Sequence, residues 1–180
     1  CALPIYDEYD ALYDYEMVIR EFPATQAYTD AVAAEFEIAR EYLRGKRKKF
    51  WGMRIENAEH IGEDLIIRVA ERLPKSRLAE RAVMELGEYY ARERDLRATV
   101  EVYDVFIQLF DRSERLPLAY ERRMFASIAR FKGPSYDGGA LLDALAHARA
   151  FEARFPTEAR AAGVDALKAR IDESLAAQML

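Results

Sequence analysis

Apolar residues recur along most of the chain at steps of three and four, which is the spacing of one face of an α-helix. Each apolar stripe is accompanied by polar residues at the remaining positions of the helix. The stripes begin at Tyr6, Ala27, Ile61, Ala79, Leu96, Tyr120, Leu141 and Val164. No stretch shows the alternation of β-branched residues that is typical of strands. The pattern therefore predicts an all-α fold of eight helices.

Proline and glycine stand where these stripes stop. The chain contains eight Gly and six Pro. Pro23 and Pro74 follow the first and third stripes, and Gly45 follows the second. Because proline lacks the backbone donor that a helix interior requires, it marks helix ends. Glycine commonly ends a helix in the left-handed conformation.

The same punctuation recurs in three stretches of the chain. Each stretch has an apolar helix end, an aromatic residue or Leu, Pro, a short polar pair and an Ala-bearing helix. They are residues 18–31 (VIREFPATQAYTDA), 69–82 (VAERLPKSRLAERA) and 150–162 (AFEARFPTEARAA). A fourth copy, residues 105–119 (VFIQLFDRSERLPLA), has Asp111-Arg112-Ser113 in place of the Pro. A helical-hairpin repeat of about 34 residues with insertions explains this spacing.

These punctuated hairpins resemble tetratricopeptide repeats, in the form found in the family of the outer membrane protein assembly factor BamD. The stretches that carry the resemblance are Val18–Ala31, Leu73–Phe110, with its paired Tyr89-Tyr90, and Phe151–Ala162. The resemblance implies a single domain over 1–180, a right-handed α-solenoid of about four tetratricopeptide-like hairpins. The expected units are 1–22 (partial), 24–73 with an insertion at 46–60, 75–111, 114–155, and a terminal helix at 157–180. The alternative is a helical bundle without repeats, in which the proline punctuation is coincidental.

The resemblance also implies a function. Members of this family are lipid-anchored periplasmic scaffolds of diderm bacteria, which bind the barrel-assembly machine and its clients and catalyse nothing. We therefore expect a non-catalytic protein that binds other proteins in the periplasm, with or without an anchor in the outer membrane. The first alternative is a general tetratricopeptide adaptor of another envelope or cytoplasmic complex. The second, less favoured, is a helical-bundle enzyme that uses buried carboxylates.

Composition narrows the function classes further. The chain has 180 residues, 33% of them charged, and a formal net charge of -5. This mildly acidic balance argues against a dedicated nucleic-acid binder, which normally has a basic face. Charges interrupt every apolar run before it reaches the length that spans a bilayer. One Cys and two His argue against a Cys/His zinc site.

Cys1 has two interpretations. A mature bacterial lipoprotein begins with the Cys that carries the lipid, and Ala2 is acceptable after it. However, Leu3-Pro4-Ile5-Tyr6 leads directly into the first helix without the usual polar tether. Lipidation of Cys1 and an unrelated start at a Cys both stay open.

A basic and aromatic cluster stands out in this acidic chain. It consists of Lys46, Arg47, Lys48, Lys49, Phe50, Trp51 and Arg54. One interpretation is a contact with anionic lipid headgroups or with an acidic partner. The favoured one is a helix C-terminus stabilised by basic residues, with Phe50 and Trp51 covering the open end of a hairpin.

A second candidate site is the inner face of the solenoid. The first helix of each hairpin is expected to line this face, within residues 26–44, 76–92 and 117–132. Seven residues there are expected to lie off the buried stripes: Glu35, Arg40, Glu85, Tyr89, Arg92, Arg122 and Arg123. They could hold an extended peptide or a helix by hydrogen bonds and ion pairs. The alternative is an ordinary solvated helix face.

Catalytic and metal-binding patterns are weak. Glu56 and His60 lie four residues apart on an expected helix, but a di-metal bundle site requires Glu-x-x-His pairs. We expect His60 on the surface and His147 on a hairpin face. No serine lies in a nucleophile elbow. The sequence thus predicts no enzyme activity, no metal and no cofactor.

Overall fold

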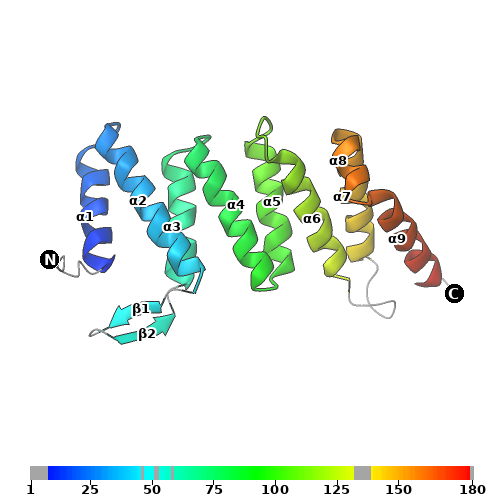
Figure 1. The fold of residues 1–180 in the computed structure, drawn as a ribbon, viewed down its shortest axis with the longest axis horizontal. Helices are drawn as coiled ribbons and strands as arrows, with labels where there is room; N and C mark the ends of the chain where they lie inside the picture. Colours follow the sequence, from blue (N-terminus) through cyan, green and yellow to red (C-terminus); the bar gives the residue numbers. More distant parts are fainter. Residues whose placement is uncertain (1–7, 46, 51–52, 58, 132–138, 179–180) are drawn as a thin grey trace. The chain divides into compact units, whose positions relative to one another are not determined.

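A computed structural model describes residues 8–45, 47–50, 53–57, 59–131 and 139–178, with side chains over 10–45, 59–131 and 139–176. The chain divides into two compact units, Cys1–Tyr89 (unit 1) and Tyr90–Leu180 (unit 2). Helices account for most of the described residues, and within each unit several helices that are neighbours in sequence pack against each other (Figure 1). The predicted helical fold class is confirmed for them, with one short hairpin of strands as an exception.

Unit 1 is built from α1 (Glu8–Glu21), α2 (Gln26–Leu43), α3 (Glu59–Arg72) and most of α4 (Arg77–Arg92). α2 packs against both α1 and α3. The core of this unit includes Phe36 of α2 and Ile66 of α3, both fully buried. α2 and α3 approach most closely at Gly62, where an added Cβ would lie 2.9 Å from the carbonyl oxygen of Ala39. Gly62 therefore sets how closely the two helices can pack.

Two copies of the repeated sequence motif adopt the same turn. After Pro23 and Pro74, the next residues, Ala24 and Lys75, have φ of 61° and 60°. The following Thr25 and Ser76 each accept a hydrogen bond from the backbone N–H three residues later, at 3.2 and 3.0 Å. Each hydroxyl thereby caps the start of the next helix. The motif thus encodes a specific helix–turn–helix geometry at the α1–α2 and α3–α4 connections.

The other two copies form different connections. Ser113 accepts a hydrogen bond from the backbone N–H of Arg115 at 2.9 Å, ahead of α6. Pro156 lies at the first position of a short helix, α8 (Pro156–Ala161), as its fixed φ allows. Gly163, with φ 72°, separates α8 from α9 (Val164–Gln178). The prediction of one terminal helix over 157–180 is therefore wrong, and the described residues form nine helices instead of eight.

Unit 2 contains α5 (Leu96–Leu109), α6 (Leu116–Ala129), α7 (Gly139–Arg154), α8 and α9. α6 packs against α5 and α7, and α7 packs against α8 and α9. Aromatic rings occupy its centre. Tyr120 stacks on Phe151 at 6.3 Å between ring centroids and meets the edge of Phe155 at 5.5 Å.

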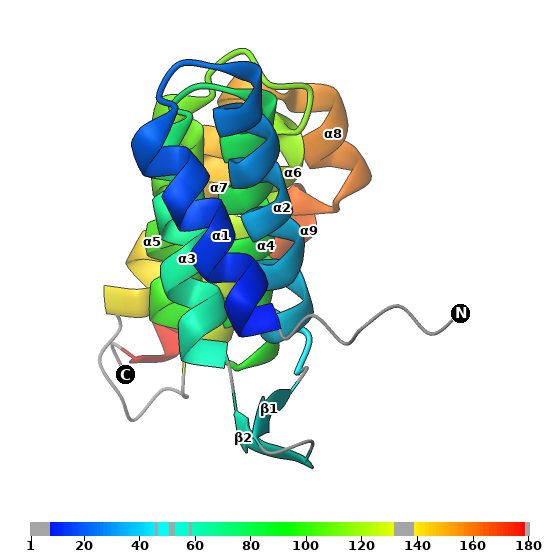
Figure 2. The same ribbon diagram turned by 90° about the vertical axis from the view of Figure 1, so that its left-hand side faces the viewer.

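A short antiparallel hairpin connects α2 to α3 (Figure 2). Its strands are β1 (Arg47–Phe50) and β2 (Met53–Asn57), with an irregularity in the pairing after Lys48. α2 ends at Leu43, and Gly45 follows with φ 85°, as the sequence predicts. The interpretation of this segment as a basic helix end is wrong, because its backbone is extended. Glu56 consequently lies on β2 and His60 on α3, so the two do not share a helix.

Candidate functional site

An array of ion pairs connects α2 to α4 within unit 1. The guanidinium of Arg40 donates to Glu37 at 2.6 Å and to Glu85 at 2.8 Å. Arg81 of α4 donates to Glu37 at 3.3 Å, and its guanidinium lies 4.8 Å from the ring centroid of Phe36. Such partly exposed pairs contribute little stability individually. They do cover this part of the unit with fixed charges of both signs, which suits a polar protein partner.

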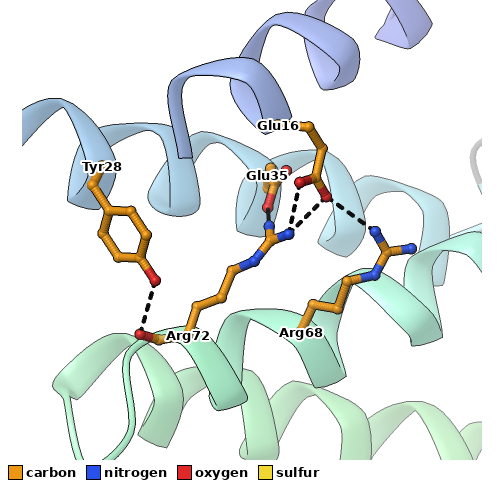
Figure 3. A network of polar contacts seen from close by, with 5 residues as sticks. All are labelled: Glu16, Tyr28, Glu35, Arg68 and Arg72. Atoms are coloured by element: carbon orange, nitrogen blue, oxygen red, sulfur yellow. Dashed lines mark hydrogen bonds and ion pairs between the residues drawn. The ribbon is translucent and has the colours of Figure 1, made fainter. Parts of the chain in front are cut away.

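A second network, with a fully buried Glu35 and a half-exposed Arg68, lies between α1, α2 and α3. Arg72 of α3 donates to Glu35 of α2 at 2.5 Å and to both carboxylate oxygens of Glu16 of α1, at 2.7 and 2.8 Å. Arg68, one turn earlier on α3, also donates to Glu16, at 3.0 Å. Tyr28 donates its hydroxyl to the backbone carbonyl of Arg72 at 3.1 Å. Figure 3 shows carboxylates from two different helices converging on one guanidinium.

Glu35 is the most deeply placed charge of this network. Its exposed fraction is 0%, and its second carboxylate oxygen has no hydrogen-bond partner among the described residues. Burial raises the pKa of Glu35 above its ordinary value of 4.5, Arg72 opposes that shift, and the nearby Glu16 adds to it. Desolvation is the dominant cause, since the charged form loses hydration that one arginine only partly replaces. Arg72 is therefore required to keep a charge at this position.

The main polar cluster of unit 2 lies between α5, α6 and α7. Arg123 of α6 is 8% exposed, donates to Asp104 of α5 at 2.5 Å, and lies 4.9 Å from the ring centroid of Tyr120. One turn further on α6, the buried hydroxyl of Ser127 hydrogen-bonds the Nδ1 atom of His147 on α7, at 2.7 Å. Burial lowers the pKa of His147 below 6.5, and the positive charge of Arg123 acts in the same direction. The imidazole is thus held neutral by its surroundings.

This serine–histidine pair does not form a nucleophilic site. Ser127 is fully buried at 0% exposure, so its hydroxyl is closed to a substrate. The pair therefore links α6 to α7 and orients the imidazole. His147 accordingly faces the neighbouring helix, in line with its predicted position on a hairpin face. His60 is exposed on α3, as predicted.

Three of the seven residues predicted to face a partner are buried instead. Glu35, Tyr89 and Arg123 have exposed fractions of 0%, 8% and 8%. The error for Glu35 comes from the phase of the α2 stripe. The buried face includes Val32, Glu35, Phe36 and Ala39, so Glu35 lies on the face from which the prediction had excluded it. None of these three side chains lies on a solvent-facing surface.

The remaining four are accessible to different degrees. Arg40 and Glu85 are partly buried and paired with each other. Arg92 and Arg122 are exposed. Because Arg40 and Glu85 lie on α2 and α4 within unit 1, the ion-paired region becomes the best-defined part of the predicted partner surface. Arg92 and Arg122 belong to unit 2.

Other predicted sites fall largely outside the described residues. Cys1, Lys46 and Trp51 lie outside them, so lipidation and the membrane or acidic-partner patch stay predictions. Arg47, Lys48, Lys49, Phe50 and Arg54 lie on the two strands, where the structure describes the backbone alone. Their placement on a hairpin is the one structural fact added to that patch.

The sequence pattern did not identify Glu16, Arg68 and Arg72 as members of one polar network. A signal was present, since Arg68 and Arg72 are four residues apart and therefore lie on one face of a helix. The other half of the signal was Glu35, a charge inside the buried stripe of α2. Their meeting depends on how three helices pack, which periodicity within a single helix does not specify.

Among the described side chains, no group of three or more His, Cys, Asp and Glu is placed to hold a metal ion. None of the described helices is both long and apolar enough to cross a bilayer. No protein-family model matches this chain, and no curated protein matches it either.

Proposed function

We propose that this protein is a non-catalytic scaffold that binds other proteins through stacked helical hairpins. By its resemblance to the BamD family, its role is in the assembly of outer-membrane β-barrel proteins in a diderm bacterium. The hairpins would stack as a right-handed α-solenoid. The observation that carries the proposal is the repeated turn, in which Pro, a left-handed residue and a capping hydroxyl recur at α1–α2 and α3–α4.

The packing of helices against sequence neighbours supports this role. In a hairpin array each helix buries its apolar stripe against adjacent helices and leaves its polar side for partners. In unit 1 the polar side of α2 and α4 has Arg40, Glu37, Glu85 and Arg81 held in place by mutual ion pairs. Side chains that are already ordered lose less conformational entropy when a partner binds.

The matching partner is a polar peptide or helix with charges of both signs. Arg44 and Arg81, about half exposed, supply accessible cations at this face, and Glu37 supplies an accessible carboxylate. The buried Glu35, Tyr89 and Arg123 take no direct part in this recognition. Glu35 and Tyr89 are buried in unit 1, which presents the surface, and Arg123 is buried in unit 2.

In-cell photo-cross-linking of the full-length protein tests the proposal. A photoreactive amino acid replaces Arg81 on α4, and a matched control replaces Arg97, which is 80% exposed on α5 of unit 2. The expected result is cross-linking of the large barrel-assembly subunit and of nascent outer-membrane proteins at position 81, with much less at 97.

Other outcomes separate the alternatives. Cross-linking at position 81 to an unrelated complex would favour the general tetratricopeptide adaptor and overturn the assembly role. If neither position gives a defined protein partner, the scaffold proposal itself is wrong.

A further inference from the structure

α1 is held to unit 1 in a different way from the other helices. Four helices of the described chain, α1, α3, α5 and α6, have the same length of 14 residues. α3 buries Gly62, Leu65, Ile66 and Val69. In contrast, Ile19 is the only buried residue among the described side chains of α1. Ala11, Leu12, Tyr15 and Val18 of α1 are partly buried, so α1 packs on the unit with fewer fully buried apolar side chains than α3 does.

Ion pairs add to this apolar packing. Glu16 places its carboxylate between Arg72, with two hydrogen bonds at 2.7 and 2.8 Å, and Arg68, at 3.0 Å. Bidentate arginine–carboxylate contacts of this kind are directional and strong. Glu16 thus adds a directional polar attachment to the apolar packing of α1.

The side chain of Arg72 is held in position by groups outside α1. Glu35 binds the guanidinium of Arg72 from α2, and Tyr28 binds the backbone carbonyl of Arg72 (Figure 3). Neither contact involves α1. The side chain of Arg72 is therefore oriented by α2 and α3 themselves, so it can bind a carboxylate from another helix.

The exposed side of α1 mixes charged and apolar residues. Tyr13 is 68% exposed, Met17 is exposed one turn further on, and Phe22, the residue that follows α1, is 56% exposed. These large apolar side chains leave apolar surface at α1 that a partner could cover.

We infer that the surface of α2 and α3 beneath α1 is a helix-binding site, which α1 occupies in the free protein. Its partner is an amphipathic helix with an acidic residue placed like Glu16, and that residue docks on Arg68 and Arg72 when α1 is displaced. This inference rests on the proposed scaffold function for its class of partner. α1 then acts as a tethered competitor, whose high effective concentration keeps weak binders off the site.

A synthetic α1 peptide, residues 8–25 with a fluorescent label, tests exchange at this site on the purified full chain. The wild-type chain should bind the peptide weakly, because its own α1 competes. The chain variant Glu16→Gln should bind it at least about tenfold more tightly, since its α1 has lost charged hydrogen bonds worth that much. The chain variant Arg20→Gln, a matched change at an exposed position of α1, should behave like the wild-type chain.

Two further comparisons identify the recognition chemistry. A peptide that itself carries Glu16→Gln should bind the Glu16→Gln chain no more tightly than it binds the wild-type chain. The double chain variant Glu16→Gln with Arg68→Gln should lose the gain in affinity of the single variant. The buried Glu35 accepts a hydrogen bond from Arg72, whereas Arg68 donates to Glu16, so the Arg68 change spares the buried pair. Hydrogen exchange of the α1 amides should be faster in Glu16→Gln than in Arg20→Gln.

Several results would overturn the inference. Equal binding of the peptide to the wild-type and Glu16→Gln chains, or no binding to either, would show that α1 is not exchangeable. Equal binding of the wild-type and Glu16→Gln peptides would show that the site does not recognise the carboxylate of Glu16. Dimerisation of the Glu16→Gln chain, measured by light scattering, would instead assign the site to α1 of a second copy. Cross-linked partners at position 81 without peptide exchange would leave the scaffold standing and remove this site alone.

Discussion

Unit 1 fully encloses a carboxylate, whereas unit 2 fully encloses a serine hydroxyl that is hydrogen-bonded to a neutral histidine and leaves the charged Arg123 8% exposed. In unit 1, Glu35 is fully enclosed and its charge is balanced by Arg72 from another helix. In unit 2, Ser127 is fully enclosed, and its partner His147 has a pKa lowered by burial. A buried charge depends on its counterion, while a neutral pair depends on the packing that surrounds it. The two units should therefore fail for different reasons.

The largest effect is expected from the aromatic core of unit 2. Phe151→Ala removes a ring that contacts Tyr120 and Phe155 and leaves a cavity beside Met124. The free energy of unfolding should fall by about 4 kcal/mol, which is typical of a buried Phe→Ala change. Urea denaturation followed by circular dichroism measures it. Phe125→Ala, at a partly exposed position on α6, is the control, and an equal loss there would contradict the prediction.

Removing the counterion of unit 1 should come next. Arg72→Met keeps most of the side-chain volume but leaves Glu35 buried without its cation. We expect a loss of about 3 kcal/mol in the free energy of unfolding at pH 7, because a broken buried pair leaves an uncompensated charge. The matched change Arg68→Met, on the same helix at a half-exposed site, should cost less than about 1 kcal/mol. Similar losses in both variants would mean that the pairing with Glu35 contributes little.

A smaller effect, dependent on pH, is expected in unit 2. The pKa of His147 is lower in the folded protein than its ordinary value of 6.5, so the unfolded chain binds the proton more readily. Its contribution to stability is complete above pH 6.5 and is lost as the pH falls through the lowered folded value. His147→Gln keeps a polar group near Ser127 and removes this titration. The variant should therefore lose less stability than the wild-type protein between pH 7.5 and 5, and parallel curves would disprove the assignment.

The smallest effect is expected from Glu35, with the opposite sign. Its pKa is raised above 4.5 in the folded protein, so folding favours the protonated form. Its contribution to stability rises as the pH falls through the raised value and levels off below 4.5. Glu35→Gln, which resembles the protonated form, should be at least as stable as the wild-type protein at pH 7. That advantage should shrink toward pH 4, and a marked loss of stability at pH 7 would contradict the prediction.

Together the two pH experiments sharpen the comparison between the units. Between pH 6.5 and 4.5, protonation of His147 weakens unit 2, and protonation of Glu35 favours unit 1. Unfolding curves of the Glu35→Gln and His147→Gln variants, measured against the wild-type protein, separate these contributions. The quantity compared is the difference in unfolding free energy between each variant and the wild-type protein at each pH. In this difference the contributions of the other titrating groups cancel.

Turn chemistry was the part of the fold that sequence predicted best. Pro23 and Pro74 end helices, and Thr25 and Ser76 begin the next ones, because these residues act through their own backbone neighbours. The same local reasoning failed at residues 47–57. There the cations mask any alternation of apolar residues, so the strands had no recognisable signal.

The candidate site was only partly predictable for a related reason. Arg40 and Glu85 were identified, but their direct pairing follows from the placement of α2 beside α4. Glu35 was assigned to the surface because an error of one position in a helical stripe turns a side chain by about 100°. Periodicity alone does not fix that phase when alanines lie on both sides of the true stripe.

The sequence by itself determined the helices, their ends and the repeated turns, since each depends on interactions within a few residues. Only the tertiary structure decided which charges are buried and with whom they pair. Glu16, Glu35 and Arg72 come from three helices, up to 56 positions apart in sequence, and each is unremarkable on its own helix. Their meeting, and with it the inferred helix-binding site, depends on the distance between packed helices. That distance is set at contacts such as Gly62 against Ala39, which no single-helix pattern contains.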